Sequence, residues 1–187
     1  MEYINQTEKI FKYLELNLDF KEKYFLLTLK RKFNNDLNLF GCFIKDYLII
    51  KNKGLVSKDE EIYNDFVMFF EENSKFYSKR ALLDDIDTYA LHYLTIVFEE
   101  CNYEPLLSAI STINSCFMLD AYPYLMVLIG KYFNLEISEN EFNLKLQNLV
   151  DIVIKKMEEP SCCENLYNLL SLEDNINLDD SSKRLVG

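Results

Sequence analysis

Glycine, proline and tryptophan are scarce in this chain of 187 residues, which has four glycines, three prolines and no tryptophan. An all-β sandwich or barrel needs turn residues roughly every 8 to 12 positions, so this scarcity argues against such folds. Hydrophobic residues make up 49% of the chain and charged residues 27%, a balance typical of soluble globular proteins. The composition therefore favours an all-α fold.

Signals for metal binding, secretion and membrane insertion are missing as well. The five cysteines show no CxxC spacing and there is a single histidine, so we predict no metal site and no cofactor. The N-terminus lacks the apolar segment of a secretory signal peptide, which predicts a cytoplasmic protein. The longest apolar region, 106–130, is interrupted by Asp120 and Pro123, so we predict no membrane association.

Helix starts are the clearest motif in the sequence. In a capping box, a residue that caps the first free amides is followed three positions later by a glutamate that reaches back. Four such boxes precede segments with apolar residues at helical spacing. They are Asp19 with Glu22, Ser57 with Glu60, Ser138 with Glu141, and Ser161 with Glu164.

Weaker signals predict the remaining helices. We expect further helix starts at Thr7, Asp36, Asp84 or Asp85, Glu104–Pro105 and near Asp120, although 42–50 could instead form a strand because it is rich in β-branched and aromatic residues. The fold class is therefore all-α, a compact bundle of about eight or nine helices. Irregular stacked helical hairpins are the alternative. Residues 1–173 are assigned to one domain, and 174–187 to a mobile acidic tail.

The centre of the core is expected in 124–129, which is apolar on all sides and therefore predicts a buried helix. The preceding helix carries only small uncharged residues opposite its apolar side, which indicates packing on two sides or a concave surface. These small residues are Ser108, Ser111, Thr112 and Ser115.

Catalytic motifs are absent from the sequence. His92 is the only side chain with an ordinary pKa near neutrality, and helical spacing places it on the polar face of its helix, so we expect a surface histidine. The single glycines at 54 and 130 lack the spacing of a phosphate-binding loop. We therefore predict that the protein is not an enzyme.

Charge is distributed very unevenly along the chain. The formal net charge is −11, with residues 1–56 at +3 and residues 57–187 at −14. No lysine or arginine occurs between Arg80 and Lys131, although this stretch holds seven acids. Soluble surfaces ordinarily mix the two signs, so a one-sided stretch indicates a binding surface for a basic partner and argues against nucleic acid.

Tyrosines alternate with these acids, and tyrosine is enriched at protein interfaces because it joins a rigid apolar ring to a hydrogen-bonding tip. The predicted partner-binding residues are Asp84, Asp85, Asp87, Tyr89, Glu99, Glu100, Tyr103, Glu104, Asp120 and Tyr122.

The functional hypothesis is that this protein is a small acidic inhibitor of a basic protein. The target is a toxin or nuclease-like enzyme that acts on nucleic acid, and the inhibitor neutralises it by covering its active cleft. In general character the chain resembles immunity proteins that neutralise toxins and inhibitors encoded by phages. The alternative is an interaction domain similar to viral regulators with the Bcl-2 fold, which bind an amphipathic helix in an apolar groove. The sequence predicts no particular oligomeric state.

Overall fold

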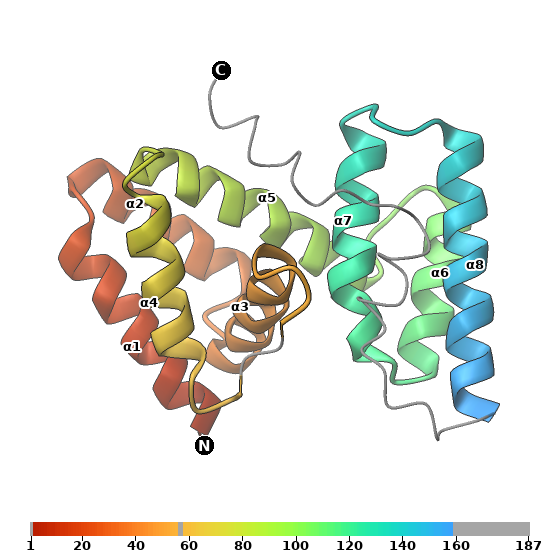
Figure 1. Cartoon of the computed structure of the whole chain (residues 1–187), viewed down its shortest axis with the longest axis horizontal. Helices are drawn as coiled ribbons and strands as arrows, with labels where there is room; N and C mark the ends of the chain where they lie inside the picture. Colours follow the sequence, from red (N-terminus) through yellow and green to blue (C-terminus); the bar gives the residue numbers. More distant parts are fainter. Residues whose placement is uncertain (1, 56–57, 159–187) are drawn as a thin grey trace. The chain divides into compact units, whose positions relative to one another are not determined.

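The computed structural model describes residues 2–55 and 58–158, which contain eight α-helices, one short 3-10 helix and no strand (Figure 1). This confirms the all-α fold class and the expected number of helices. None of the described helices is long and apolar enough to cross a membrane. In chain order the elements are α1 (Glu2–Asn17), α2 (Phe20–Lys32), α3 (Leu37–Lys51), α4 (Ile62–Asn73), α5 (Lys79–Phe98), α6 (Glu104–Ser115), η1 (Leu119–Ala121), α7 (Tyr122–Phe133) and α8 (Glu139–Glu158).

The described residues fall into two compact units, divided within α5. The first unit runs through Ala90 and the second begins at Leu91. Each unit is described by itself below. The assignment of 1–173 to one domain stays a prediction, and the predicted tail at 174–187 lies outside the described residues.

Two of the predicted capping boxes can be followed in the structure. Asp19 accepts from the Glu22 amide at 2.8 Å while the Glu22 carboxylate accepts from the Asp19 amide at 2.8 Å, so the box that opens α2 is complete. At the start of α8 the Glu141 amide donates to Ser138 Oγ at 3.2 Å. The box at 161–164 and residue 57 lie outside the described residues.

Three predicted helix starts are wrong. Thr7 does not cap a helix, because α1 begins at Glu2 and buries Thr7 in its interior. The helix expected at 57 begins at Ile62, after a turn. Asp84 and Asp85 do not start α5, which begins at Lys79. Ser78 supplies the cap there, since its Oγ accepts from the Ala81 amide at 3.1 Å.

The segment 42–50 is helical and not a strand. Asp36 accepts from the amides of Asn38 and Leu39 and so opens α3 as predicted. The helix ends where the Gly54 amide donates to the Ile49 carbonyl at 2.8 Å, with Gly54 at φ 88°. This left-handed conformation is one that glycine adopts without steric penalty.

The core of the first unit is aromatic. Phe40 stacks on Phe11 with ring centroids 4.5 Å apart and meets the edge of Phe33 at 5.1 Å, which joins α1, α3 and the end of α2. Phe66 and Phe70 of α4 are also fully buried, and Phe70 meets the edge of the Tyr13 ring of α1. Such ring pairs add specific geometry to the burial of apolar surface that holds the helices together.

The core of the second unit is centred on α7, as the sequence predicts. Residues 121–129 are all buried, and Leu128 is completely inaccessible to solvent. Helices α6 and α8 run parallel. Their N-terminal ends lie together, since the hydroxyl group of Tyr103, just before α6, donates to Asn143 in the first turns of α8. In this unit α7 runs in the opposite direction (Figure 1). The Tyr132 ring of α7 stacks on the Phe142 ring of α8, with ring centroids 4.2 Å apart.

The small-residue side of α6 packs on no second element in the part of the chain that the structure describes, contrary to one of the two expectations. Ser108, Ser111 and Ser115 are exposed in the structure.

Three helices of the second unit end in left-handed residues other than glycine. These residues are Glu99 after α5, Phe117 after α6 and Leu135 after α7, with φ between 54° and 59°. Each turn closes through main-chain hydrogen bonds, for example from the Met118 amide to the Ile113 carbonyl. Residues other than glycine have a Cβ atom that is sterically disfavoured in this conformation. Each position therefore carries a backbone penalty of about 1 kcal/mol.

Candidate functional site

The predicted partner-binding residues are divided between the two units. Four of them, Asp84, Asp85, Asp87 and Tyr89, lie on the part of α5 that belongs to the first unit. The other six belong to the second unit.

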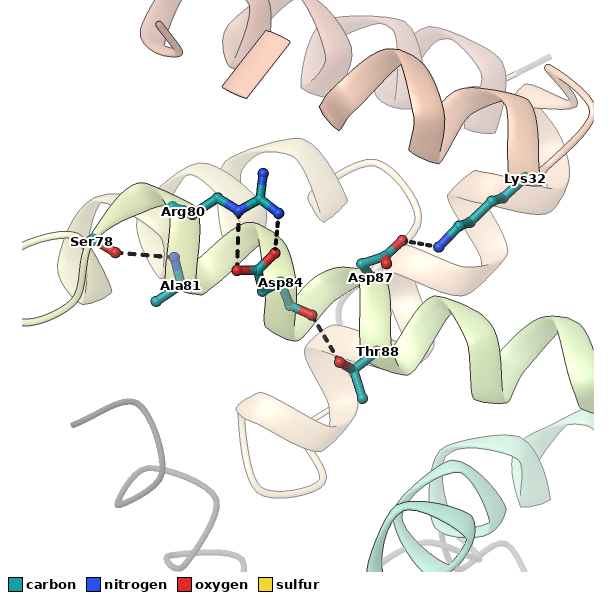
Figure 2. Close-up of polar contacts among 7 residues, drawn as sticks. All are labelled: Lys32, Ser78, Arg80, Ala81, Asp84, Asp87 and Thr88. Carbon is teal, nitrogen blue, oxygen red and sulfur yellow. Dashed lines mark hydrogen bonds and ion pairs between the residues drawn. The ribbon is translucent and has the colours of Figure 1, made fainter. Parts of the chain in front are cut away.

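Two aspartates of the first unit are paired with basic side chains (Figure 2). Arg80 holds Asp84 with two contacts one turn away on α5, from Nε at 3.1 Å and from Nη2 at 2.8 Å. Asp87 accepts from Lys32 at the end of α2 at 2.5 Å, with both side chains mostly buried. The bases that compensate these acids therefore come partly from a distant stretch of sequence.

Asp85 belongs to a network that is more deeply buried. Lys51 contacts both carboxylate oxygens, at 2.8 and 3.0 Å, and the Tyr47 hydroxyl donates to Asp85 Oδ2 at 2.6 Å. The Lys51 and Asp85 side chains are 14% and 16% exposed. Burial, followed by the charge and hydrogen bond of Asp85, raises the pKa of Tyr47 well above its ordinary value, so the phenol stays protonated as the donor. Tyr89 also contacts this network, since the Lys51 ammonium lies over its ring, 4.6 Å from the ring centroid.

Glu99 and Asp120 lie near the C-terminal end of α6 in the second unit, and Glu100 directly follows Glu99 in the chain. Asn114, in the last turn of α6, donates to Glu99 Oε1 at 3.0 Å and accepts from the Tyr122 hydroxyl at 2.7 Å. Asp120 is in η1, two residues before Tyr122. These three carboxylates are exposed and form no ion pair with a described residue, whereas Tyr122 is buried.

Tyr103 and Glu104 lie at the other end of α6, about 18 Å away for a helix of this length. The Tyr103 hydroxyl contacts Glu139 at 3.1 Å as well as Asn143, so it is engaged with α8. Glu104 is exposed at the first position of α6. Asp120 and Tyr122 therefore lie toward one end of α6 and Tyr103 and Glu104 at the other, while Glu100 is only three residues before Tyr103 in the chain.

Exposed apolar side chains lie in the turn that leads to Asp120, and the sequence analysis missed them. Phe117 is 86% exposed and Leu119 is also exposed, in the turn between α6 and α7. Helical spacing continued from Ile113 would place Phe117 on the inner side of α6, but the helix ends at Ser115 and the left-handed turn directs the ring outward. We call Glu99, Glu100, Phe117, Leu119 and Asp120 the η1 surface.

The prediction that His92 is a surface histidine is wrong. Its Nδ1 atom is buried, and its ring lies against Gly130 of α7, where an added Cβ would be 3.1 Å from Cε1. Burial lowers the pKa of His92 to about 4, although a main-chain hydrogen bond with Met126 acts in the opposite direction. At neutral pH the imidazole is uncharged and serves as a packed side chain.

These groups offer negative charge, hydrogen-bonding atoms and exposed apolar area. Among the described residues, no group of three or more His, Cys, Asp and Glu side chains is arranged to hold a metal ion. The η1 surface offers negative charge and exposed apolar area side by side, which is a combination suited to a protein partner. Comparisons with models of protein families, with curated proteins and with solved structures find no match.

Proposed function

We propose that this protein is an acidic inhibitor that binds a basic, nucleic-acid-acting protein and covers its active cleft, and that the η1 surface makes the contact. One observation carries the proposal. Glu99, Glu100 and Asp120 are exposed with no ion-pair partner among the described residues, and Glu99 and Asp120 lie near the end of α6, where Phe117 is exposed.

The charged and the apolar side chains of such a surface affect different steps of binding. Unpaired carboxylates attract a basic partner over about one Debye length, which raises the association rate. An exposed aromatic side chain that is desolvated on binding slows dissociation, and such anchors dominate interface energies. Asp84, Asp85 and Asp87 are less suited to this role, because each already has a cation beside it.

The test begins with capture of a basic partner from host lysate at low and high salt, followed by kinetics with the identified partner. We expect Glu99→Gln, Glu100→Gln and Asp120→Asn together to lower the association rate about tenfold at low salt. Phe117→Ser should mainly raise the dissociation rate. The partner's action on nucleic acid should stop when the intact protein is added and continue when the variants are added.

A matched control keeps the total charge equal. Glu8→Gln, Glu61→Gln and Glu72→Gln remove three exposed carboxylates from the first unit and should leave the association rate near that of the intact protein. If this control slows association as much as the η1 variant, net charge alone drives binding and the η1 surface is the wrong site.

A further inference from the structure

One face of α2 combines large apolar side chains with positive charge, on a protein whose acids outnumber its bases by 31 to 20. Phe20 is 89% exposed, and Tyr24 and Leu27 are exposed beside it. The spacing of four and three residues aligns them in one stripe, about 10 Å long. Helical spacing places Lys23 and Arg31 along the same side, both exposed.

This face contains no acidic side chain. The one acid of α2, Glu22, is turned back to the Asp19 amide in the capping box. Lys21, Lys23 and Arg31 form no ion pair with any described residue, whereas Lys30 and Lys32 are paired with Glu15 and Asp87. We call Phe20, Lys23, Tyr24, Leu27 and Arg31, together with Lys21 at their edge, the α2 face.

The opposite side of α2 is already buried. Leu26 and Leu29 are almost inaccessible to solvent and pack in the core of the first unit. The helix is therefore apolar on two sides, and only the inner side is needed for the fold. An exposed apolar stripe of this kind marks a contact with another molecule.

Charge restricts what can cover the α2 face. Two copies of this face cannot pair symmetrically, because lysine and arginine would meet lysine and arginine. The complementary surface has to be acidic and to carry exposed apolar groups. The chain itself carries such a surface at the turn between α7 and α8.

At this turn Leu135 is 88% exposed, and Phe133 is exposed two residues before it. Residues 131–141 hold three glutamates and one lysine, and Glu136 and Glu139 are exposed. Glu104 lies at the same end of the unit, because the neighbouring Tyr103 contacts Glu139. We call Glu104, Phe133, Leu135, Glu136 and Glu139 the turn surface.

We propose that the α2 face of one copy binds the turn surface of a second copy, so that the protein associates head to tail. Lysines and arginine meet glutamates, while Phe20, Tyr24 and Leu27 pack on Phe133 and Leu135. A contact between two different surfaces produces a ring or an open chain of copies and not a two-fold dimer. The proposal uses neither Phe117 nor the carboxylates of the η1 surface, so it stands independently of the proposed function.

Sedimentation velocity of the full chain tests the association. The average mass should rise with concentration at low salt and rise less at high salt. Lys21→Glu with Lys23→Glu should weaken association at least about tenfold, and Tyr24→Ser with Leu27→Ser should do the same with less dependence on salt. Both pairs are exposed, so helical circular dichroism should be unchanged.

Complementation makes the test specific for the two surfaces. Glu104→Lys with Glu136→Lys should also give a monomer. Mixing this variant with Lys21→Glu, Lys23→Glu should restore a heterologous pair. The control Lys58→Glu with Lys75→Glu changes the charge equally, away from α2, and should associate like the intact chain.

Three results would overturn the proposal. They are an intact chain that stays monomeric at high concentration, a mixture of the two variants that stays monomeric, and a Lys21→Glu, Lys23→Glu variant that associates normally. A monomeric intact chain that binds vesicles containing phosphatidylserine, and loses this binding with Lys21→Glu, Lys23→Glu, would assign the α2 face to a membrane instead.

Discussion

The two units treat their carboxylates differently. In the first unit Asp84, Asp85 and Asp87 each contact a basic side chain, and the Lys51–Asp85 pair is mostly buried. In the second unit Glu99, Glu100 and Asp120 are exposed with no such partner among the described residues. The acidic residues between Arg80 and Lys131 are therefore paired within the fold in the first unit and exposed to solvent in the second.

The cores differ as well. The first unit encloses a charged network beside its aromatic rings, whereas the second surrounds α7 with apolar groups and one neutral imidazole. Substitutions in the two cores should therefore lower the free energy of unfolding for different physical reasons.

Leu128→Asp should have the largest effect, because it places an unpaired charge where the side chain is completely inaccessible. We expect a loss of more than about 4 kcal/mol in the free energy of unfolding, or no soluble protein. Thermal melting followed by helical circular dichroism measures this. A variant with an unaltered melting curve would show that α7 is not the centre of the second core.

Lys51→Met should cost about 3 kcal/mol in the free energy of unfolding, because Asp85 would remain mostly buried without its cation. Urea denaturation provides the measurement. Arg80→Gln is the matched control, since the Arg80–Asp84 pair is about half exposed on each side and should contribute less than about 1 kcal/mol. Equal losses in the two variants would remove the distinction between the buried network and the exposed pair.

Acid should weaken the protein through His92. Its folded pKa of about 4 lies below the ordinary value of 6.5, so protonation favours the unfolded chain. The contribution of the neutral imidazole is therefore complete above about pH 6.5 and is lost as the pH falls toward 4, to a limit of roughly 3 kcal/mol. Denaturation at several pH values should show a shallower decline for His92→Gln than for the intact chain. Parallel curves would contradict the buried, neutral histidine.

Gly130→Ala should have the smallest effect, because two opposing contributions nearly cancel. Alanine favours the helix by about 1 kcal/mol, while its Cβ would lie 3.1 Å from His92 Cε1 and push the ring aside. In a His92→Ala background the steric contribution disappears, so Gly130→Ala should then stabilise by about 1 kcal/mol. Melting temperatures of the four chains form the double-mutant cycle, and simple additivity would show that the two residues do not touch.

Local features of the fold could be predicted from the sequence. The Asp19 and Asp36 caps, the Glu104–Pro105 start and the buried α7 depend on neighbouring residues or on helical periodicity, and the structure confirms them. Thr7 failed as a cap because a polar residue of that type is also accommodated inside a helix, where α1 buries it.

The candidate site depended on contacts that no local pattern reveals. The stretch between Arg80 and Lys131 contains no base, yet Lys32 and Lys51 contact Asp87 and Asp85 from 55 and 34 residues away. His92 was misplaced for a related reason, since the polar side of α5 at that point is covered by α7. Helical spacing shows which residues share a face, but not which element covers that face.

The left-handed turn residues have a consequence for variation among sequences. Phe117 and Leu135 are disfavoured twice for folding, by the backbone conformation and by their exposure to water. A library of substitutions selected only for a folded, soluble product should enrich glycine and asparagine at both positions. The same library selected for an interaction should retain Phe117 or Leu135, so the difference between the two selections would read out, at single-residue resolution, what each turn is for.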